Sequence, residues 1–313
     1  MYCYHPMEIH LAGGHTDLGK KRYVFNLRES IDPDRQLADP RVHVTIPCGQ
    51  CIACRVRRAQ EWSARLWLEW RMSRAPSCFL TLTYDDDHLP SDRSLRVEDY
   101  QLFLKRLRKL LEPQKIRYYC AGEYGSELER PHYHLLIYGC DFGSSRMPLA
   151  NVFNRLHPDY YISADVAKCW DKGYHTIAPL SDACICYVAK YVIKKATGLQ
   201  ADDYYGGRRP EFGIGSKGIA REYYDQYVDD LWDKDYLRWG DRFKKCRPFR
   251  YYEKILEKND FERLTKLKDE RILHHINTRK EVFDKDEVMR RRLDEQAQAH
   301  NYKIFAAARH TQF

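Results

Sequence analysis

The 313-residue sequence contains no run of about eighteen apolar residues, so it predicts no membrane-spanning helix. Its first residues, Met-Tyr-Cys-Tyr-His-Pro, lack the basic and apolar blocks of a secretory signal. Its eleven cysteines are an odd number, which does not suit a framework of paired disulfides. We therefore expect a protein that works with reduced thiols in a cytoplasm.

The sequence also lacks a strong excess of charge of one sign. Its 53 Lys and Arg residues exceed its 45 Asp and Glu residues by only 8, a balance that is common in many kinds of protein. The 24 tyrosines, 6 tryptophans and 12 phenylalanines offer rings that can stack on unpaired bases as well as fill a core. Composition therefore permits a polyanionic partner without establishing one.

Complete nucleotide-binding motifs are absent as well. In Gly14-His-Thr-Asp-Leu-Gly19-Lys20, the next residue is Lys21, where a phosphate-binding loop requires Ser or Thr. The segment 213–218 matches a dinucleotide fingerprint only in its glycines, because no βαβ unit is predicted around it. The chain is therefore not expected to be an ATPase, and any helicase that it needs must be another protein.

A His-x-His pair lies on a predicted strand. Residues 132–138 are rich in aromatic and branched side chains, and Gly139 follows them. Residues two apart on a strand face the same way, about 6.6 Å apart, so His132 and His134 can bind one cation. The alternative is a pair of hydrogen-bonded histidines on a half-buried strand.

Residues 182–195 predict a helix, because apolar residues recur at intervals of three and four. Tyr187 and Tyr191 lie one turn apart on one face of it. Lys190 and Lys194 form a second pair beside them, where their ammonium groups could hold a phosphate. The alternative is an amphipathic helix with two core tyrosines and a solvated lysine edge.

These two segments belong to a set of four ordered motifs that resembles the HUH endonucleases, and within them the replication initiators of microviruses of the gokushovirus type. The motifs span about half of the chain. They are Cys48-Gly-Gln-Cys51-Ile-Ala-Cys54, Phe79-Leu-Thr-Leu-Thr-Tyr84-Asp-Asp-Asp-His-Leu-Pro90, Gly122-Glu-Tyr-Gly125 running to Arg130-Pro-His-Tyr-His134, and Tyr187-Val-Ala-Lys-Tyr191-Val-Ile-Lys-Lys195.

The resemblance implies an α+β fold, with a ferredoxin-like or RRM-like antiparallel sheet flanked by helices and with N- and C-terminal extensions. It also implies initiation of rolling-circle replication. A tyrosine nicks the viral origin, keeps a 5′-phosphotyrosine and leaves a 3′-hydroxyl primer, and later strand transfer releases a circular single-stranded DNA. The implied partners are single-stranded origin DNA and a host helicase and polymerase, in the cytoplasm of a host bacterium. The oligomeric state stays open.

The same resemblance implies a divalent cofactor, Mg²⁺ or Mn²⁺. A phenol with a pKa near about 10 is a poor nucleophile at neutral pH, so a metal held by His132 and His134 would assist it. Hard cations prefer oxygen ligands, and Glu123 is our candidate for that ligand. Residues 116–122 predict a strand that pairs with the His-x-His strand, and many HUH initiators place a carboxylate there. The polar cluster 85–88 is either a DNA or metal contact or a solvated turn.

The resemblance further implies that Tyr187 and Tyr191 alternate as nucleophiles, although a single-tyrosine mechanism is the alternative. Two other functions are kept open for the whole chain. One is a non-catalytic, zinc-dependent protein that binds single-stranded DNA, and the other is a different HUH enzyme, such as a transposase or a relaxase.

Cys48, Cys51 and Cys54 have the spacing of metal ligands. Cys3 could be the fourth ligand of a structural zinc ion, with His5 as the alternative. A set of reduced, partly buried cysteines at the start of a helix explains the spacing equally well.

The helix predicted at residues 52–74 carries four arginines that could face DNA phosphates. We expect Lys195, beyond the tyrosine pair, to contact DNA too. The four arginines are Arg55, Arg57, Arg58 and Arg65.

We expect three parts along the chain. Residues 1–75 form an N-terminal extension with the cysteines and a long helix, residues 76–200 the HUH nuclease core, and residues 201–313 a largely helical C-terminal region. Residues 202–210 are predicted to be a loop. Residues 242–250 mix basic and aromatic side chains, as in a DNA-contacting segment or a plain exposed loop.

Overall fold

The computed structural model describes residues 3–15, 21–24, 43–125, 128–149, 159–194, 200–240, 242–278, 289 and 291–299. The chain divides into two compact units, the smaller formed by Met1–Arg57 with Glu281–Phe313 and the larger by Arg58–Lys280. This division rests on contacts alone, so the three functional parts expected above stay a prediction. Among the described residues, no helix is both long and apolar enough to cross a membrane.

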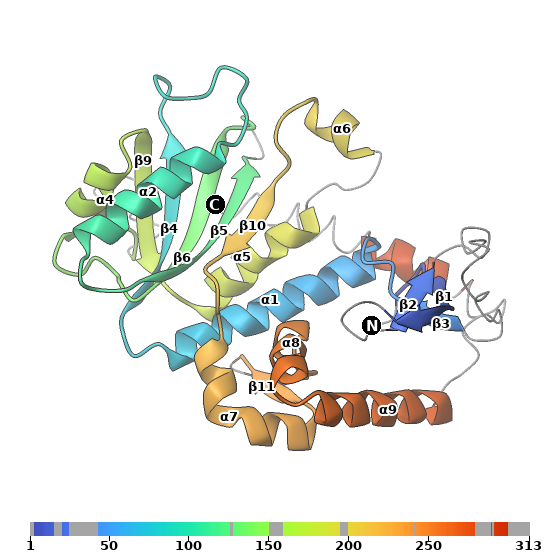
Figure 1. The fold of residues 1–313 in the computed structure, drawn as a ribbon. Coiled ribbons are helices and arrows are strands. Elements are labelled where there is room, and N and C mark those ends of the chain that lie inside the picture. The colour runs from blue at the N-terminus through green and yellow to red at the C-terminus, as the bar shows by residue number, and fades with distance from the viewer. Residues whose placement is uncertain are drawn as a thin grey trace. The chain divides into compact units, whose positions relative to one another are not determined.

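A seven-stranded sheet forms the centre of the larger unit (Figure 1). All its paired strands are antiparallel. In the order of the sheet, the strands are β10 (Phe212–Gly215), β5 (Arg117–Tyr124), β6 (Pro131–Tyr138), β4 (Ser77–Tyr84), β9 (Gly173–Pro179), β8 (Tyr161–Ser163) and β7 (Arg146–Pro148). The chain order β4, α2 (Val97–Leu110), β5, β6, α4 (Ala164–Cys169) and β9 is the ferredoxin-like pattern. The α+β fold implied by the resemblance is confirmed.

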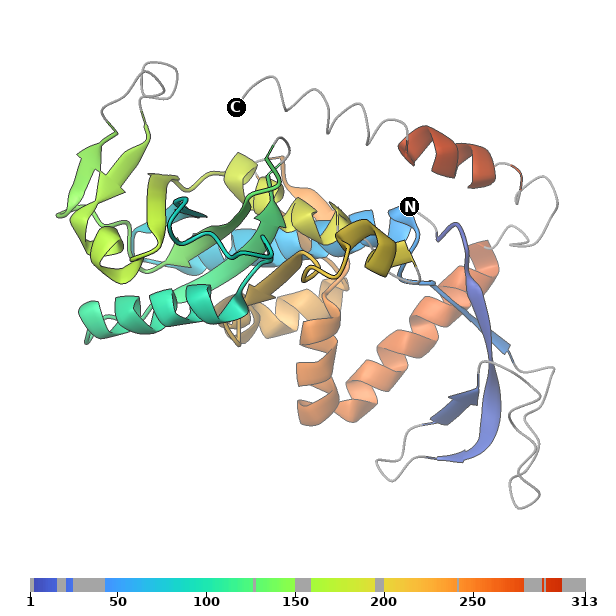
Figure 2. The same cartoon turned by 90° about the horizontal axis from the view of Figure 1, so that it is seen from above.

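Helices cover both faces of this sheet. Tyr133, Leu135 and Ile137 of β6 pack in one core cluster with residues of α2 and α4. The alternate residues Leu136 and Tyr138 pack in a second cluster with residues of α1 (Ile52–Met72) and α5 (Asp182–Lys194). Figure 2 shows α2 on one side of the strands and α1 on the other. Because β6 is buried on both faces, its sequence is continuously apolar instead of alternating.

Helix α2 shows why these segments fold as predicted. Its buried side chains recur at the spacing of one helical face, while Glu98 and Asp99 in the first turn and Arg108 and Lys109 in the last complement the helix dipole. The buried residues are Tyr100, Phe103, Leu104 and Leu107.

The edge strand β10 was not expected from the sequence. Phe212 pairs with Gly122, and Gly213 with Ala121. A Cβ atom at Gly213 would collide with the hydroxyl of Tyr119. The glycines of this segment therefore let a strand pass close over Tyr119, which agrees with the rejection of a dinucleotide-binding motif.

The rest of the larger unit is mostly helical, as the sequence predicts from Tyr251 onward. Its elements are α6 (Gln200–Tyr205), α7 (Arg221–Lys234), β11 (Leu237–Trp239), β12 (Lys244–Cys246), α8 (Arg250–Asn259) and α9 (Phe261–Thr278). The loop predicted at 202–210 is wrong in its first residues, which continue α6. Tyr205 is buried with its ring 6.4 Å from that of Tyr124, and this tertiary contact outweighs the polar composition.

The smaller unit contains a three-stranded antiparallel sheet in the order β2-β1-β3. Its strands are β1 (Met7–His15), β2 (Lys21–Val24) and β3 (His43–Ile46). Cys48 follows β3, and the first residues of α1 also belong to this unit.

Candidate active site

Strand pairing brings the predicted carboxylate and the two histidines together. Glu123 lies opposite His132 in the β5–β6 ladder, and His134 is two residues further along β6 on the same face. The Oε1 atom of Glu123 is 2.8 Å from Nε2 of His132 and 3.1 Å from Nε2 of His134. Each of the three residues offers a ligand atom, and these atoms all lie within 4.8 Å of one another.

The second nitrogen of each imidazole is also held. Nδ1 of His132 is 3.0 Å from the carbonyl oxygen of Arg130, and Nδ1 of His134 is 3.0 Å from Oγ1 of Thr81. A carbonyl can only accept, so Nδ1 of His132 carries the proton. In the neutral ring, the lone pair of Nε2 then faces the carboxylate, which is the tautomer that binds a metal through Nε2.

The carboxylate itself is buried, since Glu123 is 4% exposed. Burial alone would raise its pKa, but hydrogen bonds from His132 and His134, together with their charge, hold the pKa well below its ordinary value. Glu123 is therefore ionised at neutral pH and is an oxygen ligand ready for a cation.

The two tyrosines of α5 lie over this group. The hydroxyl of Tyr191 donates a hydrogen bond of 2.8 Å to Oε1 of Glu123. Its ring is parallel to that of His134, with centroids 5.5 Å apart, while the Tyr187 ring meets the same imidazole edge-on at 5.3 Å. Burial, followed by the charge of Glu123, raises the pKa of Tyr191 well above its ordinary value. Tyr191 is therefore a protonated donor in this arrangement.

The lysines of the same helix are less fully described. Lys190 lies on α5 with a half-buried side chain, and Lys194 is the last residue of α5. The side chain of Lys194 and the whole of Lys195 lie outside the described residues. Their roles toward DNA stay predictions.

The polar cluster 85–88 forms a turn with partners of its own. Asp85 accepts from the backbone N–H of His88 at 2.9 Å and contacts its ring, while Asp86 pairs with Arg130. The described metal-ready groups do not include these residues.

The four predicted cysteines gather in the smaller unit. Sγ of Cys3 is 3.5 Å from Sγ of Cys48 and 3.8 Å from Sγ of Cys51, and Cys54 completes the group. His5, the alternative fourth ligand, instead pairs with Glu295 at 2.8 Å.

The four predicted DNA-facing arginines of α1 have different surroundings. Arg57 and Arg58 are exposed and Arg55 is half-buried, and their contact with DNA stays a prediction. The expectation for Arg65 is wrong. Its guanidinium stacks over the rings of Trp62 and Tyr251 and donates to the carbonyl oxygen of Ile219, so it is engaged inside the protein.

The sequence reading missed two residues of the site, Thr81 and Phe79. Thr81 faces His134 in the β4–β6 ladder, and the Phe79 ring stacks on the same imidazole at 5.4 Å. Both belong to a motif noted in the sequence, but their contacts with His134 depend on the pairing register of β4 and β6.

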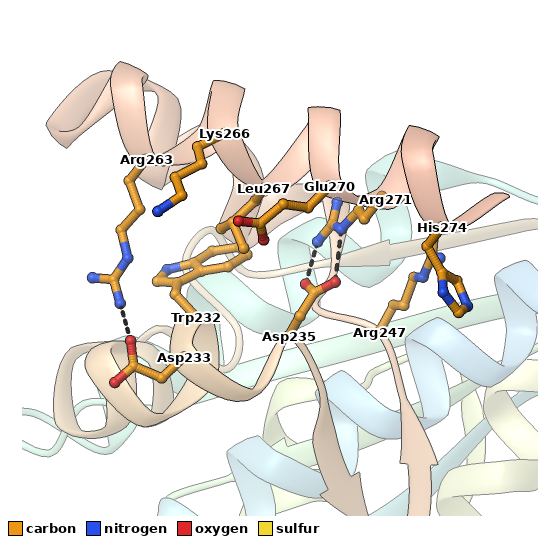
Figure 3. A pocket seen from close by; sticks show the side chains of 10 residues that line it. All are labelled: Trp232, Asp233, Asp235, Arg247, Arg263, Lys266, Leu267, Glu270, Arg271 and His274. Atoms are coloured by element: carbon orange, nitrogen blue, oxygen red, sulfur yellow. Dashed lines mark hydrogen bonds and ion pairs between the residues drawn. The ribbon is translucent and has the colours of Figure 1, made fainter. Parts of the chain in front are cut away.

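A separate pocket of about 380 Å³ lies in the larger unit between α7, β12 and α9 (Figure 3). Ion pairs join Arg263 to Asp233 and Arg271 to Asp235 across it. The charges on its walls largely pair with each other, so the pocket has no resemblance to the metal-ready group beside the tyrosines.

Comparison with known proteins agrees with this site. The model of the replication-associated protein ORF2 family matches residues 77–196, which include Glu123, both histidines and both tyrosines. Replication-associated protein VP4 of Bdellovibrio phage phiMH2K is 30% identical over 253 residues, which are 76% of this chain and 77% of that protein. The chain belongs to this family of replication-associated proteins.

Other members of the family give further matches. Replication-associated protein ORF2 of Spiroplasma virus 4 is 26% identical over 94% of this chain and 90% of its own length. Replication-associated protein ORF4 of Chlamydia phage 1 is 30% identical over 58% of this chain and 47% of its own length. No solved structure matches the chain. The resemblance to microvirus replication initiators that the four motifs predicted is confirmed.

Proposed function

We propose that this chain initiates rolling-circle replication by nicking single-stranded origin DNA and later rejoining it, with Tyr191 and Tyr187 as nucleophiles. One observation carries the proposal. A single buried carboxylate oxygen of Glu123 is shared by two imidazole nitrogens and by the hydroxyl of Tyr191. A cation ligand set and a nucleophile therefore meet at one atom.

The residues fit a divalent metal such as Mn²⁺ or Mg²⁺. Glu123, His132 and His134 are one oxygen and two nitrogen ligands, and a set of three leaves coordination positions for a phosphate oxygen. The orientation of His132, with its protonated nitrogen on the Arg130 carbonyl, directs a lone pair to the same place. When bound, such a metal would stabilise charge on the scissile phosphate and on the departing oxygen.

The protein's own groups explain the exchange of one ester for another. The tyrosine oxygen forms a bond to phosphorus, and the bond from phosphorus to the 3′-oxygen breaks. The phenol proton leaves the nucleophile, and the 3′-oxygen leaves as a hydroxyl that can prime a polymerase. The bond energy is kept in the 5′-phosphotyrosine, so a later attack by a DNA 3′-hydroxyl can rejoin the strand without ATP.

The structure supports unequal roles for the two tyrosines in the first turnover. The hydroxyl of Tyr191 lies at the carboxylate, whereas Tyr187 touches His134 and Tyr191 through its ring. We assign the first attack to Tyr191. Tyr187 would then attack the regenerated origin while the first tyrosine still carries DNA, with the host helicase and polymerase acting between the two events.

The test uses the full chain and single-stranded oligonucleotides that tile the genome encoding it. Each is incubated with the protein and Mn²⁺ or Mg²⁺, and protein–DNA adducts that survive denaturation are isolated and sequenced. We expect a metal-dependent adduct at one site in the tiling set, with a free 3′-hydroxyl on the upstream fragment. The double variant Tyr187→Phe/Tyr191→Phe should form none.

The matched control is Tyr174→Phe, because Tyr174 is 70% exposed on β9 and lies outside the described site. It should form the adduct as the natural protein does. Binding without an adduct on every oligonucleotide would overturn the proposal in favour of a DNA-binding protein. Adduct formation only on hairpin ends or a transfer origin would favour a transposase or a relaxase instead.

A further inference from the structure

The four cysteines of the smaller unit hold their sulfur atoms at the spacing of a metal site. Their Sγ atoms all lie within 4.8 Å of one another, and two pairs are 3.5 and 3.8 Å apart. Four thiolates around one zinc ion, with bonds of about 2.3 Å in a tetrahedron, have sulfur atoms about 3.8 Å apart. The described cysteines are free thiols, so disulfides do not account for this approach.

Backbone amides also point at these sulfur atoms. The N–H of Cys48 donates to Sγ of Cys3 at 3.2 Å, and the N–H groups of Gln50 and Cys51 donate to Sγ of Cys48 at 3.4 and 3.3 Å. A guanidinium nitrogen of Arg57 lies 4.0 Å from Sγ of Cys54. Hydrogen bonds and a cation favour the charged thiolate over the thiol, and the thiolate is the form that binds metal.

The apolar packing around the cluster is small. In the described part of the smaller unit, the buried group at this place consists of Cys51, Ala53 and Cys54, with Cys3, Tyr4 and Cys48 packed against it. Four of these six residues are the cysteines themselves. Small units with little apolar core commonly depend on a metal ion for stability.

We infer that Cys3, Cys48, Cys51 and Cys54 bind one structural zinc ion that fastens the segment before β1 to the start of α1. Four protein ligands close the coordination sphere, so the site supplies structure and no open position for substrate. An all-sulfur tetrahedral set suits zinc or a single iron ion, and it does not suit Mg²⁺ or Ca²⁺. This inference does not depend on the proposed nicking activity.

The test is the metal content of the full-length protein, purified without chelator or metal affinity resin. We expect one zinc per chain by elemental analysis. The variant His132→Ala/His134→Ala should keep it, because it removes only the nitrogen ligands beside the tyrosines. Cys48→Ser/Cys51→Ser should lose it, whereas the control Cys184→Ser, at a half-buried cysteine outside the cluster, should retain it.

A second measurement on the natural protein avoids variants that fail to fold. Zinc is removed under reducing conditions, Co²⁺ is added, and the absorption spectrum is recorded. Four thiolates should give an intense thiolate-to-cobalt charge-transfer band with the visible bands of tetrahedral Co²⁺. A purified protein that contains iron at the cluster, or that contains no zinc and gives no thiolate–cobalt band, would overturn the inference. So would zinc that leaves with the two histidines.

Discussion

The chain carries two groups of side chains that are ready for a cation, and they differ in chemistry and in what surrounds them. Glu123, His132 and His134 offer one oxygen and two nitrogens, on a sheet face covered by a helix with two tyrosines. The cysteine cluster offers four sulfurs and has a small apolar core around it. An incomplete set beside a nucleophile suits catalysis, whereas a complete set suits structure.

The largest expected effect comes from removing ligands of the first group. His132→Ala/His134→Ala should reduce adduct formation by more than about 100-fold, because losing direct ligands costs more than losing the partners that orient them. The rate of adduct formation with Mn²⁺ in excess measures this. His88→Ala is the control, since His88 is exposed and pairs with Asp85. A double histidine variant of natural activity would remove the catalytic role of this group.

The second expected effect separates the tyrosines. In a single turnover, Tyr191→Phe should slow the first cleavage at least about tenfold more than Tyr187→Phe, because only Tyr191 places its hydroxyl on the carboxylate. Rapid quenching followed by a denaturing gel gives both rates. Equal first-turnover rates would show that the tyrosines are interchangeable and that the contact with Glu123 does not select the nucleophile.

The third expected effect tests whether the two groups hold their metals differently. Mild chelation should abolish adduct formation, and added Mn²⁺ should restore it, while zinc stays in the cysteine cluster. Removing the zinc under stronger conditions should lower the unfolding temperature of the smaller unit by at least about 5 °C, since about 1 kcal/mol produces a shift of this size in a small unit. Calorimetry before and after each treatment shows this. Loss of both metals in a single step would contradict the distinction.

The smallest expected effect comes from a residue that orients a ligand. Thr81→Val removes the hydroxyl beside Nδ1 of His134 and nearly keeps the side-chain volume. It should weaken Mn²⁺ binding by roughly 10- to 100-fold, seen as a higher Mn²⁺ concentration for half-maximal adduct formation. Thr83→Val, two residues along β4, is the control. Equal effects of the two changes would mean that the His134 contact does not tune the site.

The sequence predicted those parts of this arrangement that depend on periodicity and on local pairing. Helix α2 and strand β6 follow from regular apolar spacing and from a run of aromatic and branched residues. Glu123 was placed near His132 because β5 and β6 are neighbours in the chain and pair as a hairpin.

The sequence could not predict contacts that depend on the register of distant elements. Thr81 reaches His134 only because β4 pairs with β6 across 53 positions of sequence. Arg65 looked like a surface cation on a helix, but Tyr251 packs against it from a segment far along the chain. Strand β10 joins β5 through residues with weak strand preference, since two of its four are glycine.

The central claim is that one buried carboxylate joins a metal site to a nucleophile. Glu123→Gln tests it most directly, because the amide keeps the size of the side chain and removes the charge. Metal-dependent adduct formation on the cleaved oligonucleotide should be lost, while binding of the same DNA, measured by fluorescence anisotropy, stays within about twofold. Adduct formation at the natural rate by Glu123→Gln, with an unchanged requirement for Mn²⁺, would contradict the account.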